Sequence, residues 1–443
     1  MKDQEMEKLI KLEAARQKRV INLIASENYV SKDVLTALGS ELTNKYAEGY
    51  STLRYYGGNE VVDQIENLVK KRALKLFKLS PKNWAVNVQP LSGSPANLAV
   101  YTALVPLGEK IMAMKLDHGG HLTHGHKVSL TGKIWNFVHY GVDRDSERLD
   151  YNEIKKIAQA EKPQLIVTGY TAYPRKIDFK KFREIADACP NPQGAGRGSY
   201  LMVDMSHFAG LVAGGVYPSP FKYADVVTTT THKTLRGPRA ALIFSRKAPA
   251  RHLASRLTVK EGNSSAQPMP RPHQIPSLKQ DSGLHTLVPN PSSLIPHFID
   301  KAIFPGLQGG PHLNQIAAVG VALQEAMSPA FKTYAKQVVK NAKVLARELE
   351  KRGWRLVSGG TDSHLILVDV WQDGKGIGGR EASERLEQAG IIVNKNTIPF
   401  DTRSPQDPSG IRLGTAAETT RGKTEADMIK ITQRIDQILR SNG

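Results

Sequence analysis

The stretch Asp225–Arg239, DVVTTTTHKTLRGPR, combines a strand signal with unusual polar chemistry. Its β-branched run predicts a buried strand, and the Gly-Pro pair that follows ends the regular structure. Lys233 stands between the strand and that break. A lysine at the mouth of a strand is a candidate imine-forming nucleophile, although most lysines lie at the surface because their charge prefers water. The rest of the chain decides between these two interpretations.

Strand and helix patterns alternate on both sides of this stretch. Strands are predicted near Val86, Ile111, Ile166, Val203, Val227 and Leu242, and helices over 59–77, 95–104, 151–160 and 179–188. Such alternation is typical of a mostly parallel sheet that helices cover on both faces. The predicted fold class is therefore α/β.

The chain of 443 residues is long enough for a large domain and a second, smaller one. We expect an N-terminal arm over 1–45, a large domain over 46–328 and a smaller C-terminal α/β domain over 329–443. A long helix near Pro329 opens the smaller domain, and strands follow near RLVS, HLILVDV and IIVN. Residues 246–298 are rich in proline, serine and basic side chains, which predicts a long irregular excursion from the large domain.

Bulk composition sets limits on the class of protein. The chain has no apolar run long enough to span a bilayer, and its charged start is unlike a signal peptide, so we expect a cytoplasmic protein without a membrane partner. The single cysteine, Cys189, excludes an intrachain disulfide. The net charge of +19 leaves nucleic acid open as a partner, but no RNA-recognition or zinc-finger signature supports it. A basic surface that recruits anionic small molecules is the preferred interpretation.

Four predicted strand ends carry polar residues of the kind that bind ligands. They are SGSPAN at 92–97, DHGGHLTHGH at 117–126, VDMSH at 203–207 and THKT at 231–234. In open α/β sheets, ligands bind outside the carboxyl ends of the strands. The coincidence at four ends therefore points to one shared site.

A carbonyl cofactor such as pyridoxal phosphate would find the groups that it needs at these ends. Lys233 would form the imine, and Asp204 would keep the pyridine nitrogen protonated. The turn at 92–97 would cradle the phosphate at a helix start, and a histidine would stack on the ring. An aspartate after a strand is often only a turn or cap residue, but His207 three positions later favours the cofactor interpretation of Asp204.

The histidine cluster at 118–126 also suggests a metal. Gly119 and Gly120 interrupt it, however, and no carboxylate or cysteine completes a zinc site, so we predict no metal. The glycine-rich stretch DGKGIGG at 373–379 matches neither a dinucleotide nor a phosphate-loop motif.

Eleven motifs together resemble the serine hydroxymethyltransferase family, in order and over nearly the whole chain. They are LIASEN, LTNKYAEGY, RYYGG, NVQPLSGSPAN, HGGHLTHG, VDMSH, VVTTTTHKTLRGPR, FPGLQGGPH, VSGGTDSHL, VNKNTIP and SGIRLGT. The resemblance implies an aspartate-aminotransferase-like large domain, pyridoxal 5'-phosphate as cofactor, and interconversion of serine and glycine with transfer of a one-carbon unit to tetrahydrofolate. It also implies a homodimer or a dimer of dimers. A folate-independent, threonine-aldolase-like cleavage of 3-hydroxy amino acids stays open as the alternative.

The same resemblance implies a role for each matching residue. The cofactor set is Lys233, Asp204, His207, His121, Ser92, Gly93 and Ser94, joined across the dimer by Tyr46, Gly309 and Gly310. Arg412, with Ser26 and Tyr56, would bind the amino acid, while Glu48 and Tyr56, beside Tyr55, would handle protons and His232 would lie near the active site. Folate would lie near Leu116, Gly120, Leu122, Asn396, Ser404 and Pro405. Gln406 stands where bacterial members of the family usually have an aromatic residue.

Overall fold

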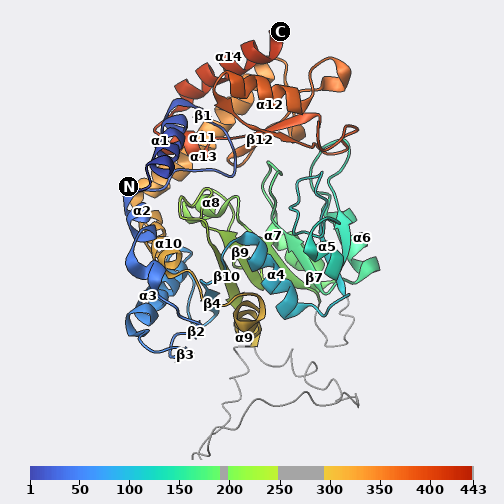
Figure 1. The fold of residues 1–443 in the computed structure, drawn as a ribbon. Coiled ribbons are helices and arrows are strands. Elements are labelled where there is room, and N and C mark those ends of the chain that lie inside the picture. Colours follow the sequence, from blue (N-terminus) through green and yellow to red (C-terminus); the bar gives the residue numbers. More distant parts are fainter. Residues whose placement is uncertain (190–197, 248–293, 442–443) are drawn as a thin grey trace, which may run out of the picture.

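The computed structural model describes residues 1–189, 198–247 and 294–441 (Figure 1). Its largest sheet has seven strands in the order β4-β10-β9-β8-β7-β5-β6. The strands are β4 (Trp84–Asn87), β5 (Lys110–Met114), β6 (Asn136–Tyr140), β7 (Leu165–Thr168), β8 (Tyr200–Asp204), β9 (Val226–Thr230) and β10 (Ala241–Arg246). The edge strand β6 is the one that the sequence patterns did not predict.

The sheet is mostly parallel, as predicted, with one reversed strand. Pairs β5·β6, β5·β7, β7·β8 and β8·β9 are parallel. β10 runs antiparallel to both of its neighbours, β9 and β4. Because two reversals cancel, β4 runs in the direction of β9, and the carboxyl ends of these strands meet at one edge of the sheet.

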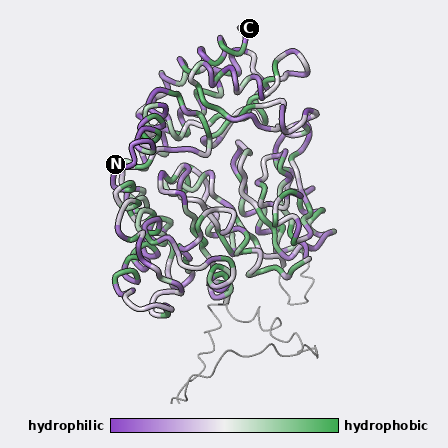
Figure 2. Tube along the Cα trace, viewed as in Figure 1, coloured by the Kyte–Doolittle hydropathy of each residue, from purple (hydrophilic) through white to green (hydrophobic). Residues whose placement is uncertain are grey.

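Helices cover both faces of this sheet. On one face, α4 (Gly93–Leu104) and α9 (Leu294–Lys301) bury Ala96, Leu104, Ile295 and Ile299. On the other face, α3 (Glu60–Leu76), α6 (Tyr151–Glu161), α7 (Phe179–Asp187) and α10 (Leu313–Ala326) contribute residues such as Val69, Ile154, Phe182 and Leu323 to a larger core. Figure 2 shows the hydrophobic segments along the sheet between these layers. The α/β class is confirmed.

A second sheet forms the upper part of the molecule in Figure 1. Its four strands are antiparallel, in the order β11 (Arg355–Leu356), β12 (Leu365–Asp369), β15 (Gly410–Gly414) and β14 (Asn394–Asn396). Helices α11 (Pro329–Lys351), α12 (Gly379–Gln388), α13 (Ala416–Thr420) and α14 (Glu425–Arg440) complete this part. The strand predicted at IIVN is split between two strands. β13 (Ile391–Ile392) pairs with β1 (Ile21–Asn22), and only β14 joins the four-stranded sheet.

Two segments lie at the margins of this architecture. The expected N-terminal arm begins with the helix α1 (Gln4–Arg19), which has no buried residue. After α2 (Lys32–Leu38), the chain forms a hairpin of β2 (Gly49–Tyr50) and β3 (Leu53–Arg54). In the described part of the chain, no helix is long and apolar enough to cross a membrane.

The excursion predicted over 246–298 falls mainly on residues 248–293, which lie outside the described residues. At its end the prediction needs a correction, because α9 begins at Leu294. Ile295 and Ile299 are four residues apart and are fully buried, so a helical face exists where proline content suggested irregular structure.

Candidate active site

A cavity of about 270 Å³ opens at the carboxyl ends of β8 and β9, beside the start of α4. It brings together ten residues that the sequence predicted for the site: Ser26, Ser92, Gly93, Ser94, His121, Asp204, His207, His232, Lys233 and Arg412. Asn97, Tyr170, Thr171, Ser206, Thr230 and Arg239 also line it. The strand ends that carry polar chemistry therefore do form one site.

Lys233 lies just after the end of β9, and hydrogen bonds at Lys233 and at the next residue, Thr234, hold this segment. Asn28 Nδ2 donates to the Lys233 carbonyl (2.9 Å), and the Thr234 hydroxyl donates to the carbonyl of His207 (2.9 Å). The side chain points back along the strand, where Nζ donates to Thr230 Oγ1 (2.8 Å). Burial lowers the pKa of Lys233 to about 8, since Asp204 offsets it only in part. About a tenth of the amine is then neutral at pH 7, far more than for an ordinary lysine, which suits an imine-forming residue.

Asp204 ends β8 on the floor of the same cavity. Asn97 Nδ2 donates to Oδ2 (3.0 Å), the Ser206 amide donates to Oδ1 (3.0 Å), and His124 Nε2 lies 3.5 Å from Oδ2. Burial by itself would raise the pKa of this carboxyl group, but these three contacts outweigh burial and hold the pKa below its ordinary value. Asp204 is therefore a fixed negative charge inside the cavity.

The other ionisable side chains of the cavity make it positive. Burial lowers the pKa of Arg412 to about 10, so its guanidinium stays charged at neutral pH. Burial also lowers the pKa of His121 to about 4 and that of His232 to about 3, so both rings are neutral. Arg239, Arg412 and Lys233 then face one carboxylate, which favours ligands with more than one negative charge.

Arg412 is oriented before any ligand arrives. It extends from β15, and its Nε donates to Asn394 Oδ1 (3.1 Å) while Nη1 donates to the Thr171 carbonyl (2.8 Å). These bonds hold the guanidinium between the second sheet and the loop after β7. A guanidinium held in this way can bind a carboxylate with two parallel hydrogen bonds.

The start of α4 supplies an anion-binding element. Ser92 is the N-cap residue, and Gly93 and Ser94 form the first turn, where amide groups lack helical partners. A Cβ atom at Gly93 would lie 2.8 Å from the Thr230 methyl group, so glycine permits the close approach of the helix to β9. The same helix therefore offers amides to a phosphate and Asn97 to Asp204.

Tyr46, Glu48, Tyr56, Gly309 and Gly310 do not line this cavity. They form a group of their own, because Tyr46 donates to Glu48 Oε1 (3.1 Å) and packs edge-on against Tyr56 at 5.2 Å. A Cβ atom at Gly310 would lie 3.2 Å from the Tyr46 ring. Tyr55 lies beside Tyr56 and is 81% exposed. One protomer thus carries the predicted residues in two separate groups.

A second cavity of about 500 Å³ lies on the other side of His121. Of the residues predicted near folate, Leu116 and Pro405 line it. Leu122 and Ser404 are exposed, Asn396 is partly buried, and Gly120 is packed against the Met114 and Lys115 carbonyls. Gln406 is exposed, and its carbonyl accepts from Lys395 Nζ (2.8 Å).

The histidine cluster does not converge on a point. His124 contacts Asp204, the Nδ1 atom of His118 accepts from the Val142 amide (3.0 Å), and His121 lines both cavities. Within the described ranges, no group of three or more His, Cys, Asp or Glu residues could hold a metal ion.

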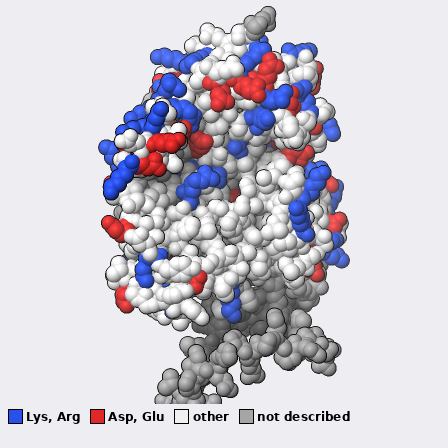
Figure 3. Space-filling view, in the orientation of Figure 1, with Lys and Arg blue, Asp and Glu red and all other residues white. Residues whose placement is uncertain are grey.

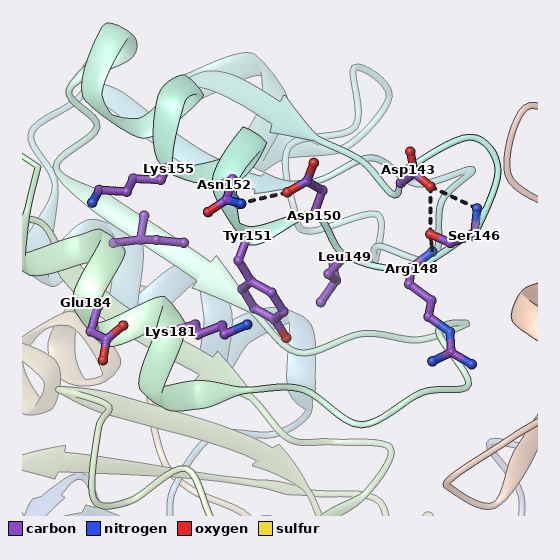
Figure 4. A pocket seen from close by; sticks show the side chains of 11 residues that line it. Asp143, Ser146, Arg148, Leu149, Asp150, Tyr151, Asn152, Lys155, Lys181 and Glu184 are labelled. Carbon is purple, nitrogen blue, oxygen red and sulfur yellow. Dashed lines mark hydrogen bonds between the residues drawn. The ribbon is translucent and has the colours of Figure 1, made fainter.

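A further pocket of about 510 Å³ lies at the surface between the 143–155 segment and α7 (Figure 4). Asp143 and Asp150 hydrogen-bond within their own turns, accepting from Ser146 and from Asn152. Lys181 lies 4.9 Å from the Tyr151 ring centroid. None of the predicted site residues lines this pocket, so the predicted chemistry belongs to the cavity at Lys233.

Sequence reasoning missed several residues of that cavity. Arg239 carried a signal, since it closes the stretch that contains Lys233, and Asn97 closes the SGSPAN motif. His364 packs against His207 behind the cavity, and although it lies in the VSGGTDSHL motif, that motif gave it no role, because the contact joins the start of β12 in the second sheet to the loop after β8. Contacts between distant elements of this kind cannot be read from local spacing.

The donors fit pyridoxal phosphate: a lysine with a lowered pKa, an ionised aspartate, the start of a helix and an oriented arginine surround one positive cavity. Fold and site together define a pyridoxal-phosphate enzyme of the aspartate-aminotransferase fold type. The sequence model of the serine hydroxymethyltransferase family matches residues 1–263 and 292–435. A serine hydroxymethyltransferase of Desulfotalea psychrophila is 48% identical over 437 residues, covering 99% of this chain and 88% of the relative.

The chain belongs to the serine hydroxymethyltransferase family. It interconverts serine and glycine with pyridoxal 5'-phosphate and exchanges the one-carbon unit with tetrahydrofolate. The family match skips residues 264–291, which lie inside the excursion predicted from composition.

Proposed function

We propose that the cavity at Lys233 is the serine and glycine site, with the residue roles that the family resemblance implies. The observation that carries this proposal is the convergence of Lys233, Asp204 and Arg412 on one cavity from β9, β8 and β15. The amine, the carboxylate and the guanidinium match the carbonyl, the ring nitrogen and the substrate carboxylate of the reaction. The ring nitrogen requires a charged carboxylate, and the carbonyl requires a neutral amine. The lowered pKa values of Asp204 and of Lys233 favour these two states.

Pyridoxal phosphate, when bound, supplies an electron sink for the electron pair that the substrate α-carbon retains when a bond to it breaks. Lys233 would hold the cofactor, Asp204 would face the pyridine nitrogen, and the start of α4 would bind the phosphate. The neutral ring of His121 would cover one face of the cofactor without adding charge. Arg412 would bind the amino acid carboxylate, assisted by Ser26, and so orient the breaking bond.

The second group of predicted residues needs a partner in order to act. Tyr46, Glu48 and Tyr56 lie outside the cavity, and Tyr46 and Tyr56 are 55% and 47% exposed. Leu53 and Val61 beside them are also exposed, at 78% and 66%. In Figure 3, the lower part of the molecule carries few charged side chains, unlike the part around α1 and the second sheet. A second copy of the chain would cover these exposed side chains and receive Glu48 and Tyr56 at its own cavity.

Mixing two inactive variants tests this arrangement. Lys233→Ala and Glu48→Gln protomers, unfolded together and refolded as a mixture, would form hybrid dimers that contain one intact site. Random pairing predicts recovery of about a quarter of the wild-type activity. As the matched control, Lys233→Ala mixed with Asp204→Asn should recover nothing, because both residues line the cavity of one protomer. Recovery in neither mixture, with dimers present by light scattering, would contradict the shared site.

The comparisons give no support to the folate-independent alternative. That alternative predicts cleavage of allo-threonine and serine at rates unaffected by tetrahydrofolate. We expect the absorption spectrum of the holoenzyme to change when glycine and tetrahydrofolate are added together, beyond the change with glycine alone. A cytoplasmic location is also proposed, supported by the single cysteine.

A further inference from the structure

A histidine pair lies behind the cavity. His364 directly precedes β12 and is completely buried. Its ring is nearly parallel to that of His207, with centroids 5.6 Å apart and an interplanar angle of 26°. The Nε2 atom of His364 lies 3.4 Å from His207 Nδ1 and 3.2 Å from the carbonyl oxygen of Ala25. One ring nitrogen thus faces both a carbonyl and a second imidazole.

The carbonyl decides where the proton of His364 resides. A carbonyl oxygen can only accept, so the Nε2 atom that faces it must carry the hydrogen. The Nδ1 atom of His364 has no hydrogen-bond partner within the described part of the chain, which fits an unprotonated nitrogen. Burial, helped by the charge of Arg412, lowers the pKa of His364 to about 3, so the ring is neutral and has a single proton.

The proton of His364 in turn decides the tautomer of His207. Because His207 Nδ1 faces an N–H group, it is the accepting nitrogen, and the ring proton resides on Nε2. Burial and the charge of Lys233 lower the pKa of His207, so this ring is neutral as well. If His364 instead carried its hydrogen on Nδ1, a lone pair of its Nε2 atom would face the Ala25 carbonyl, and that buried carbonyl would lose its donor.

We propose that His364 is a positioning residue that fixes the Nε2–H tautomer of His207, so that His207 presents an N–H donor to the cavity. This inference rests on the proposed function for its consequence, because the acceptor would be the ring oxygen of bound pyridoxal phosphate. These contacts link Ala25, next to Ser26 of the cavity, to His364 before β12 and then to His207 in the loop after β8. The donor is therefore formed only when the N-terminal segment and the second sheet are both in place.

Two substitutions separate this role from simple packing. His364→Gln keeps an N–H donor near the position of Nε2, whereas His364→Phe keeps a ring of similar size and has no donor. Nitrogen-15 NMR of the full-length chain with labelled histidine reports the tautomer directly, with the His207 signals assigned from a His207→Asn variant. We expect the Nε2–H tautomer in the wild type and in His364→Gln, with and without pyridoxal phosphate. In His364→Phe we expect loss of that single tautomer.

The affinity for pyridoxal phosphate provides the second measurement. In His364→Phe the Kd should rise roughly five- to tenfold, as the loss of one neutral hydrogen bond predicts, and His364→Gln should restore most of it. If His364→Phe does not fold, His364→Leu replaces it. An unchanged Nε2–H tautomer in a folded donor-free variant overturns the proposal. Because the tautomer is measured without cofactor, this result is independent of the Lys233→Ala and mixing tests of the proposed function.

Discussion

Asn97 Nδ2 lies 3.0 Å from Asp204 Oδ2, so the helix that begins at Gly93 also fixes the carboxylate at the end of β8. Asn97 is itself held, because the Thr228 hydroxyl donates to its Oδ1 atom (2.8 Å). Three elements, α4, β8 and β9, are thus joined under the cavity by two side-chain hydrogen bonds.

This relationship predicts a graded effect of two substitutions. Asn97→Ala removes one donor from a carboxylate that stays ionised, so kcat/KM for serine should fall about five- to tenfold. Asp204→Asn removes the buried charge and should lower kcat/KM by at least about 100-fold. Steady-state kinetics at saturating cofactor measure both. Equal losses of kcat/KM in the two variants would show that the negative charge of Asp204 does not contribute to catalysis.

Burial of Lys233 predicts a pH-dependent stability of the cofactor-free protein. Its pKa falls from 10.5 to about 8 on folding, so the folded chain binds fewer protons than the unfolded chain between these values. Stability should therefore rise as the pH increases from about 8 to 10.5. Below pH 8, Lys233→Met should be more stable than the wild type by up to about 3 kcal/mol, and this difference should vanish near pH 10.5. Urea unfolding at several pH values tests the sign, and a constant difference across this range would contradict it.

Arg412→Lys should weaken substrate binding without loss of cofactor. Lysine keeps the charge but cannot donate at once to Asn394, to the Thr171 carbonyl and to a carboxylate in two bonds. We expect kcat/KM for serine to fall roughly 10- to 100-fold, with the cofactor absorption band unchanged. The control is Asn394→Ala, which leaves the guanidinium in place and should have a smaller effect.

The hairpin that follows Glu48 depends on one buried arginine. Arg54 has a side chain only 4% exposed, and it pairs with Asp63 and with the fully buried Glu66, both at 2.8 Å. It also donates to the carbonyls of Ala47 and Gly49. Arg54→Met leaves Glu66 without this partner and should lower the free energy of unfolding by roughly 3–5 kcal/mol. Arg16→Met, which breaks a pair exposed on α1, should leave the midpoint of urea unfolding unchanged.

The sequence predicted the large sheet well because its inner strands are buried on both faces. Strands such as LIVT and VVTTT therefore read as continuous apolar or β-branched runs. β15, in contrast, is the short segment Gly410–Gly414 with glycine at both ends, and its five buried residues carry no alternating pattern. It forms because β12 and β14 pair with it on either side, which is tertiary information.

In the candidate site, too, some positions follow from local sequence patterns and others depend on tertiary contacts. Lys233, Asp204 and Ser92 follow strands that the sequence predicts, so their convergence follows from the rule for strand ends. His124 lay in a predicted cluster, but its contact with Asp204 depends on how that loop folds back. The position of Glu48 and Tyr56 outside the cavity could not be derived from spacing, because it depends on a hairpin held by Arg54.

The pairing of β1 with β13 joins Ile21 and Asn22 to Ile391 and Ile392. Val20 and Asn22 are also tied to Arg421 and Glu418 by hydrogen bonds. During synthesis the ribosome makes the first of these partners about 370 residues before the second. The segment with Ser26 and Asn28 can therefore make these contacts only when translation is almost complete. A truncated chain that stalls before residue 390 would leave this segment undocked, so the cell would not acquire a working site from an unfinished polypeptide.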